Sequence, residues 1–257
     1  MKKLSLLLSS LVLMGATLGN LSAGQPALIK VDLDRTIGAI DPNIYGSFLE
    51  PLGRGTGRDI VYGPLYDPDS PRSDENGFRK EYIQQIKDLK VTAVRWPDGN
   101  FVSGYNWEDG IGPKDQRPVT LDLSRSRKES NQMGIDEYAA FCNLVGAENF
   151  ICINAGTGTI EDAARWVEYC NAPAGTRYAD LRVKYGHPEP YKVTYWALGN
   201  EPDGPWQLGY NNKEHYAKFA IEAAKMMRGA DENILLVAAG SSNYPLVTKR
   251  YDPKDGW

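Results

Sequence analysis

The pair Asn200-Glu201 is the clearest candidate for acid–base chemistry in this sequence. It follows an apolar segment, residues 193–198, and Gly199, and it precedes Pro202-Asp203-Gly204-Pro205-Trp206. A carboxylate beside Trp206 and Trp196 at the end of a strand is poorly hydrated, which suits it to donating a proton near neutral pH. The alternative for a single loop glutamate is an ordinary hydrated side chain.

A second group of polar and aromatic residues runs from Arg95 through Asn100 to Trp107. Guanidinium and amide groups can hydrogen-bond sugar hydroxyls, and aromatic rings can stack on sugar faces. Trp107 is equally consistent with a core residue beneath a long loop. Glu50, at the end of an earlier apolar run, is a third candidate. No G-x-S-x-G motif or Cys/His pair offers a rival nucleophile.

Short apolar segments alternate with amphipathic ones from Pro42 onward. The predicted strands are 44–49, 91–94, 150–154, 193–198 and 234–239. The predicted helices are 78–89, 135–145, one capped by Thr159 with Asp162, and one beginning at Asn212. Strands separated by helices indicate a parallel sheet with right-handed crossovers.

Polar residues lie at or just after the carboxyl ends of these strands: Glu50, Arg95, Asn100, Asn154, Asn200, Glu201 and Ser241. In a (β/α)8 barrel, that face carries the active site. A doubly wound sheet also binds ligands at strand carboxyl ends. However, Gly156-Thr157-Gly158 lacks the third glycine and the lysine of phosphate-binding loops, so we expect an ordinary turn there.

The composition is that of a soluble globular protein. The 257 residues are 42% hydrophobic and 24% charged with a net charge of −4, a length that would fit a complete barrel of about 250 residues. A mild acidic excess without a Lys/Arg run argues against nucleic acid or an anionic membrane as partner. The three cysteines, Cys142, Cys152 and Cys170, favour buried free thiols, although one disulfide is possible. His187 and His215 are the only histidines and there is no C-x-x-C, so we expect no metal or other cofactor.

The first residues have the pattern of a secretory signal peptide. A basic start, Met1-Lys2-Lys3, precedes the apolar stretch Leu4 to Leu18 and the small residues Leu21-Ser22-Ala23. A membrane anchor is the alternative, but the apolar run is short for a span. We therefore expect a signal peptide in 1–23, an N-terminal strand segment with alternating Ile29, Val31 and Leu33 in 24–40, and the barrel in 41–257. The mature protein would be secreted, to the periplasm or the medium.

Several of these segments, taken in order, resemble glycoside hydrolase family 51, the α-L-arabinofuranosidases. The resemblance runs from about Ile44 to Asn243. The segments that carry it are Tyr45-Gly46-x-Phe48-x-Glu50-x-Leu52-Gly53-Arg54, Arg95 to Asn100, Tyr105 to Pro113, Asn154-x-Gly156-Thr157-Gly158, Trp166 to Asn171, Gly186 to Tyr191, Gly199 to Gly209 and Gly240 to Asn243. It implies a (β/α)8 TIM-barrel glycosidase with about the first five βα units present. The N-terminal strand would then belong to an accessory β-sandwich.

The resemblance also implies roles for the candidate residues. Glu201 would be the general acid/base of a retaining mechanism, and Asn200 would bind the 2-hydroxyl of the sugar. Glu50, Arg95 and Asn100 would bind the furanose, and Trp107 would line its pocket. The substrate would be a terminal α-L-arabinofuranoside of an arabinose-containing oligo- or polysaccharide, and the full protein is a possible homo-oligomer. Two residues depart from the family: Pro51 replaces a usual histidine, and Asp98 replaces a usual glycine.

A retaining glycosidase also needs a carboxylate nucleophile, which this family carries after its seventh strand. The predicted strands here number five, so we expect an incomplete chain that lacks its nucleophile, is inactive alone and is poorly soluble because of its open sheet edges. Two alternatives stay open. One is a family 51 enzyme acting on another glycoside, such as a xyloside or β-glucan, and the other is a non-catalytic sugar-binding protein.

Overall fold

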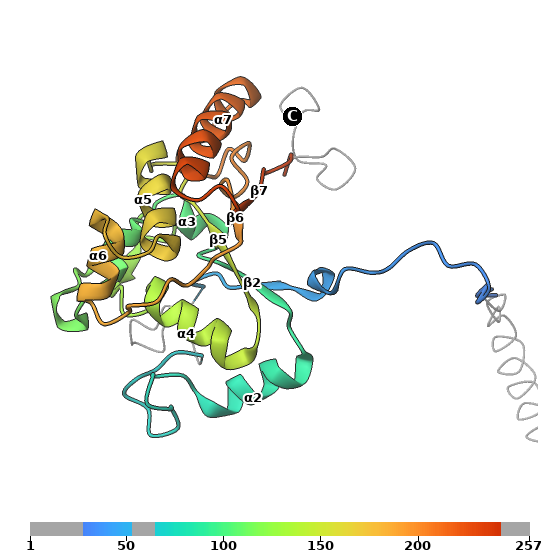
Figure 1. Cartoon of the computed structure of the whole chain (residues 1–257), viewed down its shortest axis with the longest axis horizontal. Helices are drawn as coiled ribbons and strands as arrows, with labels where there is room; N and C mark the ends of the chain where they lie inside the picture. Colours follow the sequence, from blue (N-terminus) through green and yellow to red (C-terminus); the bar gives the residue numbers. More distant parts are fainter. Residues whose placement is uncertain (1–27, 53–64, 243–257) are drawn as a thin grey trace, which may run out of the picture. The chain divides into compact units, whose positions relative to one another are not determined.

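The computed structural model describes residues 28–52 and 65–242 (Figure 1). The predicted signal peptide 1–23 and the motif residues Gly53, Arg54 and Asn243 lie outside these ranges. The chain divides into two units, Met1–Ile40 and Asp41–Trp257. None of the helices in the described ranges is long and apolar enough to cross a membrane.

The described part of the first unit, residues 28–40, contains no strand. Leu33 and Asp34 form a turn, and the alternating side chains of Ile29 and Val31 are 84% and 70% exposed. The predicted strand is therefore not seen in residues 28–40, and its place in an accessory β-sandwich stays a prediction. A strand is stable only when a neighbouring strand pairs with it, and no described residue of this unit supplies one.

The second unit is built on a parallel sheet of five strands with the order β1-β2-β5-β6-β7. The strands are β1 (Ser47–Phe48), β2 (Ala93–Trp96), β5 (Glu148–Cys152), β6 (Tyr195–Ala197) and β7 (Leu235–Val237). Each strand pairs in parallel with its neighbour in this order, for example Trp96 with Ile151 and Ile151 with Trp196. The order never reverses, as it does in a doubly wound sheet. This confirms the predicted partial (β/α)8 barrel.

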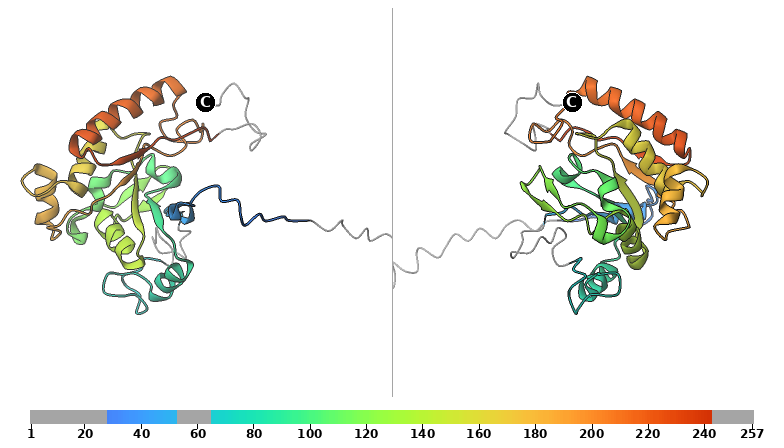
Figure 2. Two further views of the ribbon diagram at one scale, coloured as in Figure 1. Left: turned by 45° about the vertical axis from the view of Figure 1, so that its right-hand side comes forward. Right: turned by 90° about the vertical axis from the view of Figure 1, so that its left-hand side faces the viewer.

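Helices connect these strands. They are α2 (Lys80–Leu89), α3 (Gly99–Val102), α4 (Ile135–Val145), α5 (Ile160–Asn171), α6 (Arg177–Lys184) and α7 (Lys213–Ala230). Four short elements complete the unit: the 3-10 helices η1 (Pro42–Tyr45), η2 (Trp107–Gly110) and η3 (Lys114–Gln116), and the antiparallel hairpin of β3 (Thr120–Asp122) with β4 (Arg127–Glu129). Helices α5 and α7 pack side by side (Figure 2).

The predicted helix starts have the expected caps. Thr159 Oγ1 accepts a hydrogen bond from Asp162 N at 3.1 Å, and Asp162 Oδ2 accepts one from Thr159 N at 3.1 Å. At α7, Asn212 Oδ1 accepts from His215 N at 2.9 Å. All three hydrogen bonds satisfy backbone donors that a helix start otherwise leaves unpaired.

The predicted strand 44–49 is shorter than expected. Asp41 Oδ1 accepts from Asn43 N at 2.8 Å and Pro42 occupies the first helical position, so η1 forms in its first half. Only Ser47–Phe48 pairs with β2, and both residues are exposed rather than buried. The hairpin β3–β4 and helix α6 lie in stretches for which the sequence analysis predicted no element.

Aromatic residues fill the core between sheet and helices. Trp96 stacks on Tyr138 with ring centroids 4.8 Å apart, and Trp107 stacks on Trp166 at 5.7 Å. Trp166 also meets Trp196 edge to face at 6.1 Å. Such pairs add to the stabilisation that burial alone provides. Much of the chain's high tryptophan and tyrosine content is therefore structural.

The three cysteines are free and buried, as predicted. Burial raises the pKa of the Cys142 and Cys152 thiols to about 12, so both are protonated and unreactive at neutral pH. Within residues 28–52 and 65–242, no group of three or more His, Cys, Asp or Glu side chains is arranged to hold a metal ion.

Candidate active site

Arg95, Asn200 and Glu201 meet at the carboxyl ends of the parallel strands. Arg95 lies in β2, whereas Asn200 and Glu201 follow β6, yet Arg95 Nη2 donates to Asn200 Oδ1 at 3.3 Å. All three line one cavity of about 440 Å³, whose remaining wall includes residues 237–242 after β7. The strand order therefore brings together residues that are 105 positions apart in the sequence.

The backbone after β6 turns sharply to present Glu201. Gly199 has φ +95° and Glu201 has φ +44°, both in the left-handed region. A β-carbon on Gly199 would lie 2.5 Å from Cβ of Ala155 in the loop after β5. Glycine is therefore needed here for both the turn and the close approach of the two loops.

The Glu201 carboxylate is held by two donors from the loop that follows it. Trp206 Nε1 donates to Oε2 at 2.9 Å, and Gln207 Nε2 donates to the same oxygen at 3.3 Å. Gln207 is 6% exposed and also donates to Asn100 Oδ1 at 2.8 Å, while its Oε1 accepts from Ser103 Oγ at 2.9 Å. Gln207 thus links Glu201 to Asn100, and both contacts to Glu201 use Oε2.

Arg95 is anchored by the carboxylate of Asp98. Arg95 Nη2 lies 2.7 Å from Asp98 Oδ1, which also accepts from Gly99 N. Asp98 is 1% exposed, and its Oδ2 has no hydrogen-bond partner among the described residues. Burial raises the pKa of Asp98 to about 6, against the lowering effects of Arg95 and Gly99 N–H, and the charge of Glu50 adds to the rise.

Glu50 lies beside the same cluster. Its Oε1 accepts from Asn100 N at 3.1 Å and forms an ion pair with Arg125, which lies in the turn of the β3–β4 hairpin. A β-carbon on Gly99 would lie 1.9 Å from Glu50 Cδ, so the carboxyl group packs directly over this glycine. Pro51, which the resemblance marks as unusual, is buried, and nothing in the structure explains a proline here.

A further carboxylate, Asp203, ties the loop after β6 to the loop after β7. It accepts from Ser241 Oγ at 2.7 Å, from Ser242 Oγ at 2.6 Å and from Ser242 N at 3.0 Å. Burial raises the pKa of Asp203, but the hydrogen bonds from Ser242 and Ser241 outweigh it, so the net pKa is lowered. Asp203 thereby fixes the rim of the cavity.

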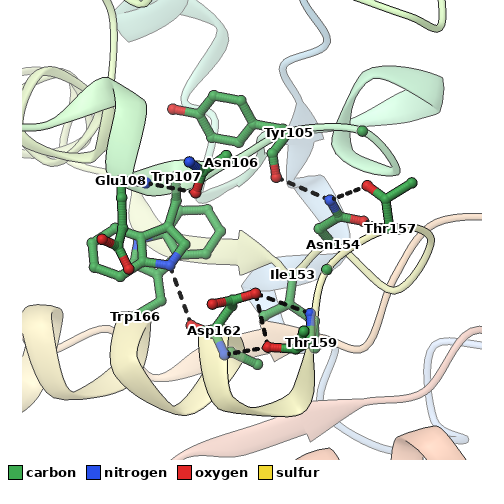
Figure 3. A pocket seen from close by; sticks show the side chains of 13 residues that line it. Tyr105, Asn106, Trp107, Glu108, Ile153, Asn154, Thr157, Thr159, Asp162 and Trp166 are labelled. Carbon is green, nitrogen blue, oxygen red and sulfur yellow. Dashed lines mark hydrogen bonds between the residues drawn. The ribbon is translucent and has the colours of Figure 1, made fainter.

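Trp107 does not line the cavity of Glu201. It is 3% exposed, stacks on Trp166, and donates from Nε1 to the backbone oxygen of Asp162 at 3.2 Å. It lines instead a second cavity of about 390 Å³ between the loop after α3 and the start of α5 (Figure 3). This placement favours the core interpretation, and the sugar contact implied by the resemblance stays a prediction.

Two residues of the site, Gln207 and Arg125, were not predicted from the sequence. Gln207 stands within a matching motif, but nothing in its type marks it as a bridge between two loops. For Arg125 there was a signal: Val119, Leu121 and Leu123 alternate with polar residues, as in a strand that leads into a turn.

The fold and site define an α/β barrel protein with a polar cavity at the carboxyl ends of its strands. More specifically, the chain belongs to the family described as Alpha-L-arabinofuranosidase 1 domain, whose pattern matches residues 85–255. It is 46% identical over 224 residues to Alpha-L-arabinofuranosidase C of Emericella nidulans, covering 87% of this chain and 44% of that protein. It is 48% identical over 222 residues to an intracellular exo-alpha-(1->5)-L-arabinofuranosidase of Acetivibrio thermocellus, covering 86% and 43%.

Solved structures of α-L-arabinofuranosidases are also similar to this chain. An arabinose complex of the α-L-arabinofuranosidase of Thermotoga maritima is 50% identical with a TM-score of 0.73, covering 77% of this chain and 40% of that one. A family 51 α-L-arabinofuranosidase of Bifidobacterium longum is 44% identical with a TM-score of 0.75, covering 83% and 40%. The resemblance to family 51 is confirmed. The chain spans less than half the length of these relatives.

Proposed function

We propose that this chain carries the general acid/base and much of the sugar-binding site of a retaining exo-α-L-arabinofuranosidase. Its relatives are named α-L-arabinofuranosidases. The observation that carries the proposal is the Glu201 carboxylate, held by Trp206 and Gln207 in the cavity that Arg95 and Asn200 also line. The substrate is a terminal, non-reducing α-L-arabinofuranosyl group of an arabinose-containing oligo- or polysaccharide.

In this proposal Glu201 protonates the departing glycosidic oxygen and later takes a proton from water. Both donors bind Oε2, so in this proposal Oε1 carries the proton that is transferred. Arg95 donates to Asn200 Oδ1, which leaves the Asn200 amide nitrogen to donate to the 2-hydroxyl. Asn100 and Glu50 contribute further contacts to the furanose.

The nucleophile is a second carboxylate about 5–5.5 Å from the first. Glu50 is engaged by Arg125 and Asn100 N, and Asp98 is buried and paired with Arg95, so neither is suited to attack. We therefore propose that the nucleophile lies outside the described residues. Labelling the full protein with an activated 2-deoxy-2-fluoro-arabinofuranoside and mapping the modified peptide tests this. A label on Glu50 or Asp98 would contradict it.

Substrate class is tested with the full protein and aryl glycosides. Release from α-L-arabinofuranosides, with the anomeric configuration retained in the first-formed sugar by NMR, is expected. Preferred release from xylosides or cleavage of β-glucans would instead support the first alternative, a family 51 enzyme of other specificity. Sugar binding without any hydrolysis would support the second, a binding protein.

We further propose that the protein is secreted, on the basis of the basic and apolar pattern of residues 1–23. Recovery of the protein from periplasm or medium with an N-terminus near Gly24 is expected. A cytoplasmic protein that retains Met1 would refute this. Absence of nucleic-acid and membrane partners and possible homo-oligomerisation stay predictions, the latter to be checked by light scattering of the full protein.

A further inference from the structure

Arg125 reaches the proposed sugar site from an element that the sequence analysis did not predict. It lies between β3 and β4, and its guanidinium pairs with Glu50, 75 residues earlier in the chain. We infer that Arg125 is a positioning residue that fixes one oxygen of Glu50 and so determines which sugar hydroxyl the site requires. This inference rests on the proposed sugar-binding role of Glu50.

The hairpin turn is built to hold Arg125 in place. Asp122, 6% exposed, accepts from Ser124 N at 2.9 Å and Ser124 Oγ at 2.6 Å, and it pairs with Arg127 at 3.2 Å. Ser126 adopts a left-handed conformation with φ +52°, which reverses the chain. The buried Asp122 carboxylate therefore binds residues on both sides of Arg125, namely Ser124 and Arg127. These contacts hold the Arg125 backbone in place before any ligand binds.

The base of the hairpin is fixed as well. Asn131 Nδ2 donates to Pro118 O at 2.8 Å, and Glu129 Oε1 accepts from Asn131 N at 2.8 Å. Asn131 is 1% exposed and Glu129 3% exposed. A hairpin held at both ends presents its turn residue with little freedom, which lowers the entropy cost of each contact it makes.

At the other end of the contact, Glu50 is held on one side only. Arg125 and Asn100 N both bind Oε1, and the carboxyl group rests on Gly99. Oε2 accepts no hydrogen bond from the described residues, and the Glu50 side chain is 11% exposed. An ionised carboxylate accepts hydrogen bonds, so Oε2 is an oriented acceptor for one hydroxyl group of a sugar.

Without Arg125 the carboxylate keeps a single backbone donor and can rotate. The hydroxyl that Oε2 binds would then lose its partner. The values of kcat/KM for glycosides with and without that hydroxyl would become more similar. A charged hydrogen bond of this kind accounts for about 10-fold to 100-fold in specificity. The lost selectivity, rather than a general loss of activity, distinguishes positioning from a purely structural role.

The test compares kcat/KM of the full protein on an aryl α-L-arabinofuranoside and on its 2-, 3- and 5-deoxy analogues. The hydroxyl that Glu50 binds is the one for which Glu50→Gln loses selectivity between the glycoside and its deoxy analogue. Arg125→Met and Arg125→Lys are then compared with Lys128→Met, which removes an exposed cation from the same hairpin. Melting temperatures show whether each variant is folded.

We expect Arg125→Met to raise KM and to reduce selectivity for that hydroxyl about 10-fold or more, with Arg125→Lys restoring part of it and Lys128→Met unchanged. Selectivity equal to wild type in a folded Arg125→Met protein overturns the inference. If wild type cleaves a different glycoside instead, the proposed substrate fails, and the same comparison on deoxy analogues of that glycoside still decides the role of Arg125.

Discussion

Asp98→Asn removes the charge of a buried carboxylate of the proposed site while keeping its shape. Oδ1 still accepts from Arg95 and Gly99 N, so the main contacts remain. What the substitution removes is the ionisation of a group that is 1% exposed. The variant therefore isolates the cost of a buried negative charge beside Arg95 and Glu50.

The size of that cost follows from the pKa of Asp98, which rises from 3.8 to about 6 on folding. A rise of about two units corresponds to about 3 kcal/mol between the two protonation states. Because the folded state holds the proton more tightly, wild type loses stability as pH rises from about 4 to about 6. About 2 kcal/mol of this loss falls between about pH 4.5 and about pH 7.5, and the Asn variant does not share it.

Thermal unfolding of the full protein and its variants measures the effect. The melting temperature of Asp98→Asn minus that of wild type should be higher at about pH 7.5 than at about pH 4.5, by about 2 °C, because the entropy of unfolding increases with the length of the full protein. Asp203→Asn is the matched control, since the pKa of Asp203 is lowered. The difference in melting temperature between Asp203→Asn and wild type should stay nearly constant from about pH 4.5 to about pH 7.5 and should become smaller only below about pH 4. If the melting temperature of Asp98→Asn differs from that of wild type by the same amount at both pH values, the reasoning is refuted.

Three further substitutions test the site. Gly99→Ala would place Cβ 1.9 Å from Glu50 Cδ at φ +62°, so KM should rise about 10-fold or more, and an unchanged KM would argue against Glu50 as a sugar ligand. Trp107→Phe should lower the free energy of unfolding by about 1–3 kcal/mol and leave KM unchanged, whereas a raised KM with unchanged stability would identify Trp107 as a sugar contact. Gln207→Met removes one donor to Glu201 and the hydrogen bond to Asn100, so kcat should fall about tenfold and KM should rise as well, and a wild-type kcat would exclude a positioning role toward Glu201.

The regular part of the barrel could be predicted from the sequence because its signals are local. Helix α4 spans Ile135–Val145 as predicted, and the caps at Thr159 and Asn212 are the expected ones. The polar ends of β2 and β6 likewise placed Arg95, Asn200 and Glu201 at one edge of the sheet. Their meeting follows from parallel strand order alone.

What could not be predicted depends on contacts between distant segments. The ion pair of Arg125 with Glu50 joins a hairpin to a residue 75 positions earlier, and local alternation in the sequence does not show that contact. The role of Gln207 likewise depends on the loop after β6 lying beside α3. The alternation in residues 29–33 predicted a strand, but a strand forms only where a neighbouring strand pairs with it. No described residue of this segment supplies that pairing.

The central claim is that Glu201 is the general acid/base, and leaving-group dependence tests it most directly. The full protein and its Glu201→Gln variant are compared on aryl α-L-arabinofuranosides with good and poor leaving groups. A poor leaving group needs the proton, so we expect a fall in kcat/KM of about 10²–10⁴-fold for it and a much smaller fall for dinitrophenolate. Equal losses on both substrates, or undiminished hydrolysis by the variant, would contradict the account.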